Sequence, residues 1–197
     1  MRKMIQSLRR DHRDVEQILR VLEQECDVFC RAERPDYELV GEIIEYLGSF
    51  LDQYHHPKED LLFKIARKSN ATCARVIDGI AAERAGAISS LQALGETLRE
   101  ILNEQRVQRQ TFEDAARAFI LHERRQIEME ERSLFPIAQS AFVPAERVVL
   151  NAKLRDENMS LRTRQLKGRL RDKRRWIIRE EVANQADRKV APPASNR

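Results

Sequence analysis

Apolar residues recur at alternating spacings of three and four over four long segments of the chain, and this pattern is typical of helices that each bury one face. The segments predict helices over 3–30 and 37–67, and two more that contain the stripes 80–102 and 112–129. No segment shows the alternation of a strand. Because the connections are short, the sequence predicts an all-α fold, an antiparallel up-down-up-down four-helix bundle.

The composition agrees with a soluble helical chain and excludes a membrane-spanning one. Charged residues make up 35 % of the 197 residues, and there are only 6 Gly and 6 Pro to form turns. No stretch approaches the roughly 18 apolar residues that a membrane span needs, so no membrane contact is expected. The three cysteines, Cys26, Cys30 and Cys73, are an odd number without a Cys-x-x-Cys pair. We therefore predict a cytoplasmic protein.

The charges divide the chain into two regions. Residues 1–152 contain 22 Lys or Arg against 26 Asp or Glu, whereas residues 153–197 contain 14 against 6. We expect a bundle over 1–150, a basic helical extension over 151–182, and a disordered tail over 183–197, which is polar and contains two prolines.

The basic extension carries loosely spaced apolar residues among its arginines. This pattern indicates a helix that packs either on the bundle or against another chain, which would be a protein partner or a second copy. Nucleic-acid binding through the arginines and Trp176 is the less favoured alternative, because runs of charge are usually solvated faces.

Polar side chains interrupt each of the four apolar stripes. The interruptions are His12, His55, Glu59, Arg84, His122, Gln126 and Glu130. Burying a titratable group costs on the order of several kcal/mol unless the group is paired or coordinated. The sequence therefore predicts either a metal or an ion-pair network in the core. His55 and Glu59 lie one turn apart on one helix face, an arrangement by which bundles hold two iron ions.

Three strings carry a resemblance to a known family. They are Asp11-His12, the string HHPKEDLLF over 55–63, and the string MEERSLFP over 129–136. Together they resemble the hemerythrin-like family, also called HHE cation-binding domains, over roughly residues 1–150. The resemblance implies a four-helix bundle with a non-haem di-iron site, used to bind oxygen, respond to nitric oxide or peroxide, handle iron, or sense redox state.

The resemblance also implies roles for individual residues. His12 and His55 would be terminal ligands of one metal, and Glu59 would be a bridging carboxylate. Of the ligands to the second metal, only Glu130 matches the family pattern. Arg84 and Gln126 stand where the pattern has histidines. The resemblance therefore implies a degraded site that holds one iron rather than two, or none.

The two replaced positions have their own physical consequences. A guanidinium stays protonated and cannot coordinate iron, and a glutamine amide is a weak ligand. We expect Arg84 to reach toward Glu59 and Glu130 and to replace a cation by a cation; the alternative is that it extends to the surface from the edge of its stripe. His122 lies one turn, about 5.4 Å, before Gln126, so it is a less favoured substitute ligand.

Two functions remain open from the sequence. The first is a metal-linked or redox-linked regulatory or stress protein, responding to oxygen or nitric oxide. The second is a metal-free interaction or regulatory module, in which Arg84 replaces the metal and the basic extension binds a partner. An enzyme is the least favoured interpretation, because the sequence has no nucleophile–base pair, phosphate loop or zinc motif, and oxygen chemistry would normally require both irons.

Overall fold

The computed structural model describes residues 2–31, 35–69, 71–103, 109–145, 148–150, 152–153 and 161–190. The regular structure in these ranges is helical throughout, without a strand. The elements are α1 (Arg2–Cys30), α2 (Tyr37–Phe50), η1 (Leu51–His55), α3 (His56–Ser69), α4 (Ala71–Leu102), α5 (Arg109–Met129), η2 (Glu130–Leu134), α6 (Phe135–Ala141) and α8 (Leu161–Val190).

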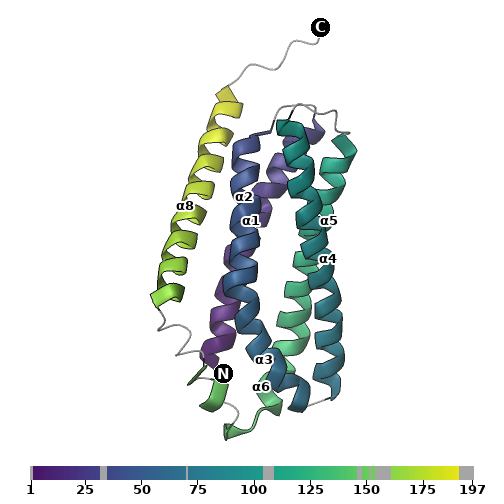
Figure 1. Ribbon diagram of the computed structural model, residues 1–197, viewed down its shortest axis with the longest axis vertical. Helices are drawn as coiled ribbons and strands as arrows, with labels where there is room; N and C mark the ends of the chain where they lie inside the picture. Colours follow the sequence, from purple (N-terminus) through teal and green to yellow (C-terminus); the bar gives the residue numbers. More distant parts are fainter. Residues whose placement is uncertain are drawn as a thin grey trace.

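Four long rods run antiparallel and make up the bundle (Figure 1). They are α1, the continuous α2–η1–α3, α4, and the continuous α5–η2–α6. The predicted all-α bundle is thus confirmed. The start of the second rod is fixed locally, because the Asp36 side chain caps α2 by accepting a hydrogen bond of 3.0 Å from the backbone N–H of Leu39.

Two of the rods contain a π-helical turn, and in each case a proline explains it. Pro57 follows η1 and Pro136 follows η2, each as the second residue of the next helix. Proline has no N–H, and its ring clashes with the carbonyl four residues back in a regular α-helix. The wider turn avoids that clash, since the N–H of His56 bonds back five residues to the carbonyl of Leu51. Each rod therefore continues past its proline.

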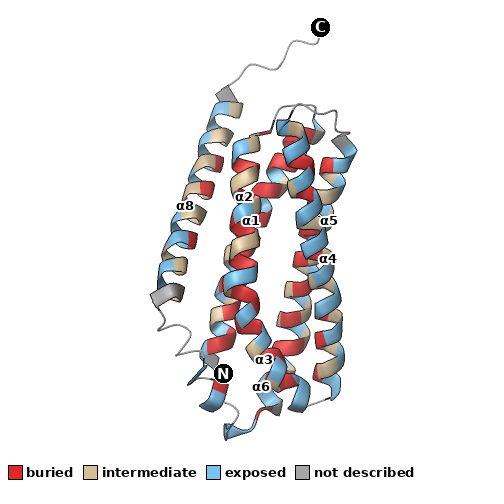
Figure 2. Cartoon of the chain, viewed as in Figure 1, coloured by how far each residue is buried: buried red, intermediate tan, exposed pale blue. Residues whose placement is uncertain are grey.

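The core consists of two apolar clusters that lie at successive heights along the bundle. Figure 2 shows the buried residues concentrated on the inner faces of the rods. Along α1, Leu8 belongs to the smaller cluster and Val15 to the larger one. Along the second rod, Leu51 belongs to the larger cluster and Leu62 to the smaller one. The polar residues His12 and His55 fall between these positions, so the polar group separates the two clusters.

Helix α8 packs along the outside of α2 and α1 (Figure 1). Leu170 and Ile177 are buried and belong to the larger core cluster. Of the two arrangements open from the sequence, the structure therefore has the helix on the bundle. α8 continues to Val190, so the expectation of a tail disordered from 183 is wrong for 183–190; the remainder, 191–197, lies outside the described residues.

Ion pairs join the basic face of α8 to the acidic bundle. Lys173 Nζ lies 2.8 Å from Glu42 Oε2 and 2.6 Å from Glu45 Oε2. Arg188 lies 2.8 Å from the fully buried Glu25, and Arg174 pairs with Asp14. The opposite charges of the two regions thus meet within the molecule. This pairing explains why part of the basic extension remains helical although its composition is polar.

In the ranges that the structure describes, no helix combines the length and the apolar character needed to cross a membrane.

Candidate metal centre

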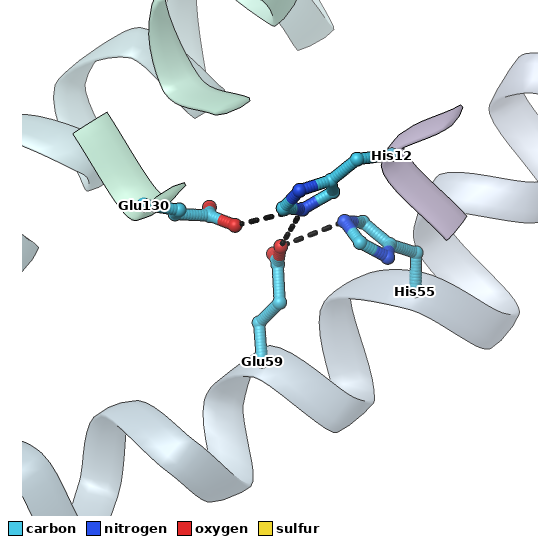
Figure 3. A group of neighbouring side chains, drawn as sticks. All are labelled: His12, His55, Glu59 and Glu130. Carbon is cyan, nitrogen blue, oxygen red and sulfur yellow. Dashed lines mark ion pairs between the residues drawn. The ribbon is translucent and has the colours of Figure 1, made fainter. Parts of the chain in front are cut away.

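Four buried polar side chains converge between the two core clusters (Figure 3). His12 comes from α1, His55 from the end of η1, Glu59 from α3, and Glu130 from the start of η2. Each is at most 3 % exposed. One nitrogen or oxygen atom from each lies within 4.8 Å of the others. The structure therefore brings together the four residues that the sequence analysis singled out as metal ligands.

The facing atoms form a donor set for a cation. His55 Nε2 lies 2.7 Å from Glu59 Oε1, and His12 Nε2 lies 3.1 Å from Glu130 Oε2 and 3.8 Å from Glu59 Oε1. Within the described residues, His12 Nε2, Glu59 Oε1 and Glu130 Oε2 are buried and, apart from these contacts among the four side chains, have no hydrogen-bond partner. Buried polar atoms are normally satisfied, and imidazole with carboxylate suits divalent transition metals. These residues therefore fit one metal ion.

Outer contacts orient the two histidines. His12 Nδ1 lies 2.8 Å from Glu131 Oε1, and this contact turns Nε2 toward the centre. His55 Nδ1 faces Asp11 Oδ2 at 3.5 Å, and Asp11 is itself paired with the buried Lys58. No supporting role was predicted for these residues from the sequence. The available sign was their position beside the predicted ligands, because each stands within one of the strings that carry the family resemblance.

The protonation states follow from burial and from mutual charge. Burial, followed by the nearby charge of Glu59, raises the pKa of Glu130 to about 8. Burial would lower the pKa of His55, but the charge of Glu59 outweighs it and raises that pKa to about 9. Burial is likewise outweighed at His12, where the adjacent carboxylates of Glu130 and Glu131 raise the pKa well above 6.5. Without a metal, these three groups therefore hold protons at neutral pH.

Glu59 itself stays ionised. Burial would raise the pKa of Glu59, but the charge of His55 and the contacts with His12 and His55 hold it well below 4.5. The carboxylate at the centre is thus the permanent negative charge of the site.

Arg84 and Gln126 occupy the other side of the two glutamates. Arg84 Nη2 donates to Glu59 Oε2 at 2.7 Å, and Gln126 Nε2 donates to Glu130 Oε1 at 3.0 Å. Gln126 Nε2 also lies 3.4 Å from Glu59 Oε2. Each glutamate therefore directs one oxygen to the histidine side and the other to Arg84 or Gln126.

Arg84 makes one of the two contacts that were expected of its guanidinium group. Its contact with Glu59 is present, but its other arm, Nη1, donates to Asp60 Oδ1 at 2.8 Å instead of reaching Glu130. Asp60 is an exposed neighbour of Glu59, so it pairs with the guanidinium without the burial of a further charge. The side chain of Arg84 is 17 % exposed, so it does not extend freely into solvent.

His122 lies outside the cluster of four. Its Nδ1 is 2.6 Å from Glu83 Oε2, and the ring is only partly buried. A Cβ added at Gly86 would come within 2.6 Å of the ring, so the imidazole occupies the space that this glycine leaves. The structure therefore gives His122 a packing contact between α4 and α5 in place of the substitute ligand position considered from the sequence.

An antiparallel four-helix bundle with histidines and carboxylates at its centre defines a class of helical cation-binding proteins. The model of the hemerythrin HHE cation-binding domain matches residues 3–138. The chain belongs to this family, as the resemblance implied. Comparison with curated proteins and with solved structures gave no match. The match ends before α8, so the basic helix lies beyond the part that resembles the family model.

Proposed function

We propose that the protein binds a single divalent cation, iron in the first place, through His12, His55, Glu59 and Glu130. The supporting observation is the division of the carboxylate oxygens. Glu59 Oε1 and Glu130 Oε2 face His55 and His12 and have no other hydrogen-bond partner within the described residues, whereas Glu59 Oε2 and Glu130 Oε1 accept from Arg84 and Gln126. One side of the pair thus faces the two histidines and offers acceptors for one ion, and a fixed guanidinium stands on the other side.

The residues around the site determine what a bound ion could do. An iron ion would supply one-electron redox chemistry and an open position for a small ligand such as oxygen or nitric oxide. His12 and His55 would hold it, the two glutamates would balance its charge, and Arg84 would exclude a second ion. Such a site serves a metal-linked or redox-linked regulatory or stress protein in the cytoplasm. Di-iron chemistry would require the histidines that are missing.

A second candidate rests on a different observation. Glu59 already pairs with His55 and with Arg84, so its charge is compensated by residues of the chain itself. The bundle could therefore serve as a metal-free interaction or regulatory module. In this case the exposed arginines of α8 would contact the partner, since its partly buried Lys173 and Arg188 already pair with the bundle.

Anaerobic titration with ferrous iron separates the two candidates. The wild-type protein should bind one ion per chain, and Glu130→Gln should weaken binding by at least about tenfold because it removes a charged ligand while preserving the contact with Gln126. Glu128→Gln is the matched control, since Glu128 is exposed and lies two residues away. Absence of binding to the wild type supports the metal-free module, and equal binding to Glu130→Gln would place the ion elsewhere.

A further inference from the structure

A cavity of about 280 Å³ lies between the second rod, α4 and α5. None of the four residues of the metal centre lines it. Its walls are largely apolar and include Leu51, Leu91 and Phe119. Its rim includes the exposed Ile88 and Asp52, so the cavity opens to solvent. The volume lies just below the range of roughly 300 to 1,000 Å³ that is typical of ligand pockets, so it suits a small molecule.

Two polar groups in this cavity have no use in the metal centre. Glu123 is 2 % exposed and His56 is 8 % exposed, and both line the cavity. Glu123 Oε1 and His56 Nε2 are buried and have no hydrogen-bond partner within the described residues. Leaving a buried carboxyl unsatisfied destabilises the fold. These atoms are therefore available for a ligand.

We propose that this cavity, the Glu123 pocket, binds a small primary amine whose ammonium group contacts Glu123 and His56 and whose hydrocarbon body lies along Leu51, Leu91 and Phe119. An ammonium group carries three donors and one positive charge, which matches a carboxylate oxygen and an imidazole nitrogen that both lack donors. The apolar walls match a short hydrocarbon chain.

The acidic groups that line the pocket favour a cation over an anion. Glu123 is the acidic group inside, and Asp52 lies at the rim, where it would attract an approaching cation. Burial raises the pKa of Glu123 to about 7, so the empty pocket holds much of this carboxyl in its neutral form, and a bound ammonium would stabilise the ionised form. A metal ion fits less well, because within the described residues the pocket does not gather three ligand groups.

Calorimetric titration of the full chain with three probes of equal length tests the charge requirement. Hexylamine should bind at one site per chain and at least about tenfold more tightly than 1-hexanol, because the alcohol lacks the charge that pairs with Glu123. Hexanoate should show no binding. Equal binding of hexylamine and 1-hexanol would show that only the apolar walls contribute and would overturn the ammonium contact with Glu123. Absence of hexylamine binding would overturn the whole proposal.

Two variants locate the bound amine. Glu123→Gln should weaken hexylamine binding by at least about tenfold, whereas Glu128→Gln, the same change at an exposed position of α5, should leave it unchanged. Gly48→Met should abolish binding by filling the cavity; a Cβ at Gly48 meets only Leu91 Cδ2, at 3.9 Å, so the new side chain enters without a clash at its base.

The same variants separate this pocket from the metal centre. Ferrous iron should bind to Glu123→Gln and Gly48→Met as it does to the wild type. Retained hexylamine binding in both variants would overturn the proposal, whatever the metal result. Absence of iron binding by the wild type would contradict the proposed function. The proposal for the Glu123 pocket would then be tested by the hexylamine result alone.

Discussion

Arg84 Nη2 lies 2.7 Å from Glu59 Oε2 and directs a permanent positive charge at the carboxylate that the family pattern assigns to a metal bridge. The other oxygen of Glu59 lies 2.7 Å from His55 Nε2. One carboxylate is thus shared between a fixed cation and a histidine. Because a guanidinium cannot be deprotonated in a protein, the Arg84 side of Glu59 stays closed to metals at any ordinary pH.

Replacing both Arg84 and Gln126 by histidine should make the second side of Glu59 and Glu130 available to a metal. In the double variant Arg84→His, Gln126→His, Glu59 Oε2 and Glu130 Oε1 would lose their present donors and face two imidazoles. We expect iron content to rise from about one to about two ions per chain, since paired carboxylates and histidines on facing helices hold two irons. The measurement is elemental analysis of the folded variant. Unchanged content would mean that the backbone no longer positions the second site.

Removal of the guanidinium alone should have opposite effects on stability and on metal binding. In Arg84→Met, Glu59 loses one counter-charge but keeps His55, so the free energy of unfolding of the metal-free protein should fall by about 2 kcal/mol, less than the ~3 to 5 kcal/mol for a fully stranded buried charge. The affinity for one divalent cation should rise, because a repelling charge is gone. Chemical denaturation and ferrous titration measure the two effects.

The pH dependence of this variant follows from Glu59. The folded-state pKa of Glu59 lies well below its ordinary value of 4.5, so its contribution to stability is present above pH 4.5 and is lost as the pH falls through the folded-state pKa. The difference between wild type and Arg84→Met should therefore be constant near neutral pH and shrink in acid. A decrease in the free energy of unfolding of less than about 0.5 kcal/mol at pH 7 would show that the ion pair does not stabilise the fold.

Metal binding should release protons. In the metal-free protein, the pKa values of His55, at about 9, and of Glu130, at about 8, together with the raised pKa of His12, keep all three groups protonated at pH 7. A metal needs the deprotonated forms, so its affinity should increase from pH 6 to pH 8 by more than about tenfold per pH unit. Calorimetry in buffers with different ionisation enthalpies counts the protons. An affinity independent of pH would place the metal on other groups.

The sequence was sufficient to predict the bundle and the four converging residues. The spacing of three and four fixes which face of each helix is buried, and polar residues on that face must meet other polar groups inside. The polar interruptions were therefore expected to meet inside the bundle, and the family resemblance singled out His12, His55, Glu59 and Glu130 among them as metal ligands. Pro57 and Pro136 stand within the second and fourth rods, but the π-helical turns that accommodate these prolines could not be predicted from the sequence.

The partners of the individual side chains could not be predicted in the same way. A guanidinium has two arms on a flexible stem, so helix spacing alone does not decide between Glu130 and Asp60 as the second acceptor of Arg84. The placement of α8 depended on contacts distant in sequence, such as Lys173 with Glu42, that no local pattern encodes. Glu123 was not identified either, because it gave no motif, although it lies three residues before Gln126 on the inner stripe of α5.

The packing of α8 on the bundle leads to a prediction about stability. Ile177 is fully buried against the bundle, whereas Val182, on the same helix, is 63 % exposed. Ile177→Asp should lower the free energy of unfolding by about 3 kcal/mol, because it buries an unpaired charge, and Val182→Asp should change it by less than about 0.5 kcal/mol. Thermal and chemical denaturation compare the two. Equal stability of both variants would mean that α8 does not contribute to the fold.

The most direct test of the single-cation centre is the metal content per chain of protein purified without chelators and loaded anaerobically with ferrous iron, together with its ultraviolet–visible spectrum. With His12, His55, Glu59 and Glu130 on one side and Arg84 on the other, we predict about one iron per chain and no charge-transfer band of an oxo-bridged pair. About two irons per chain with such a band would contradict the role of Arg84, and a chain that takes up no metal would contradict the site itself.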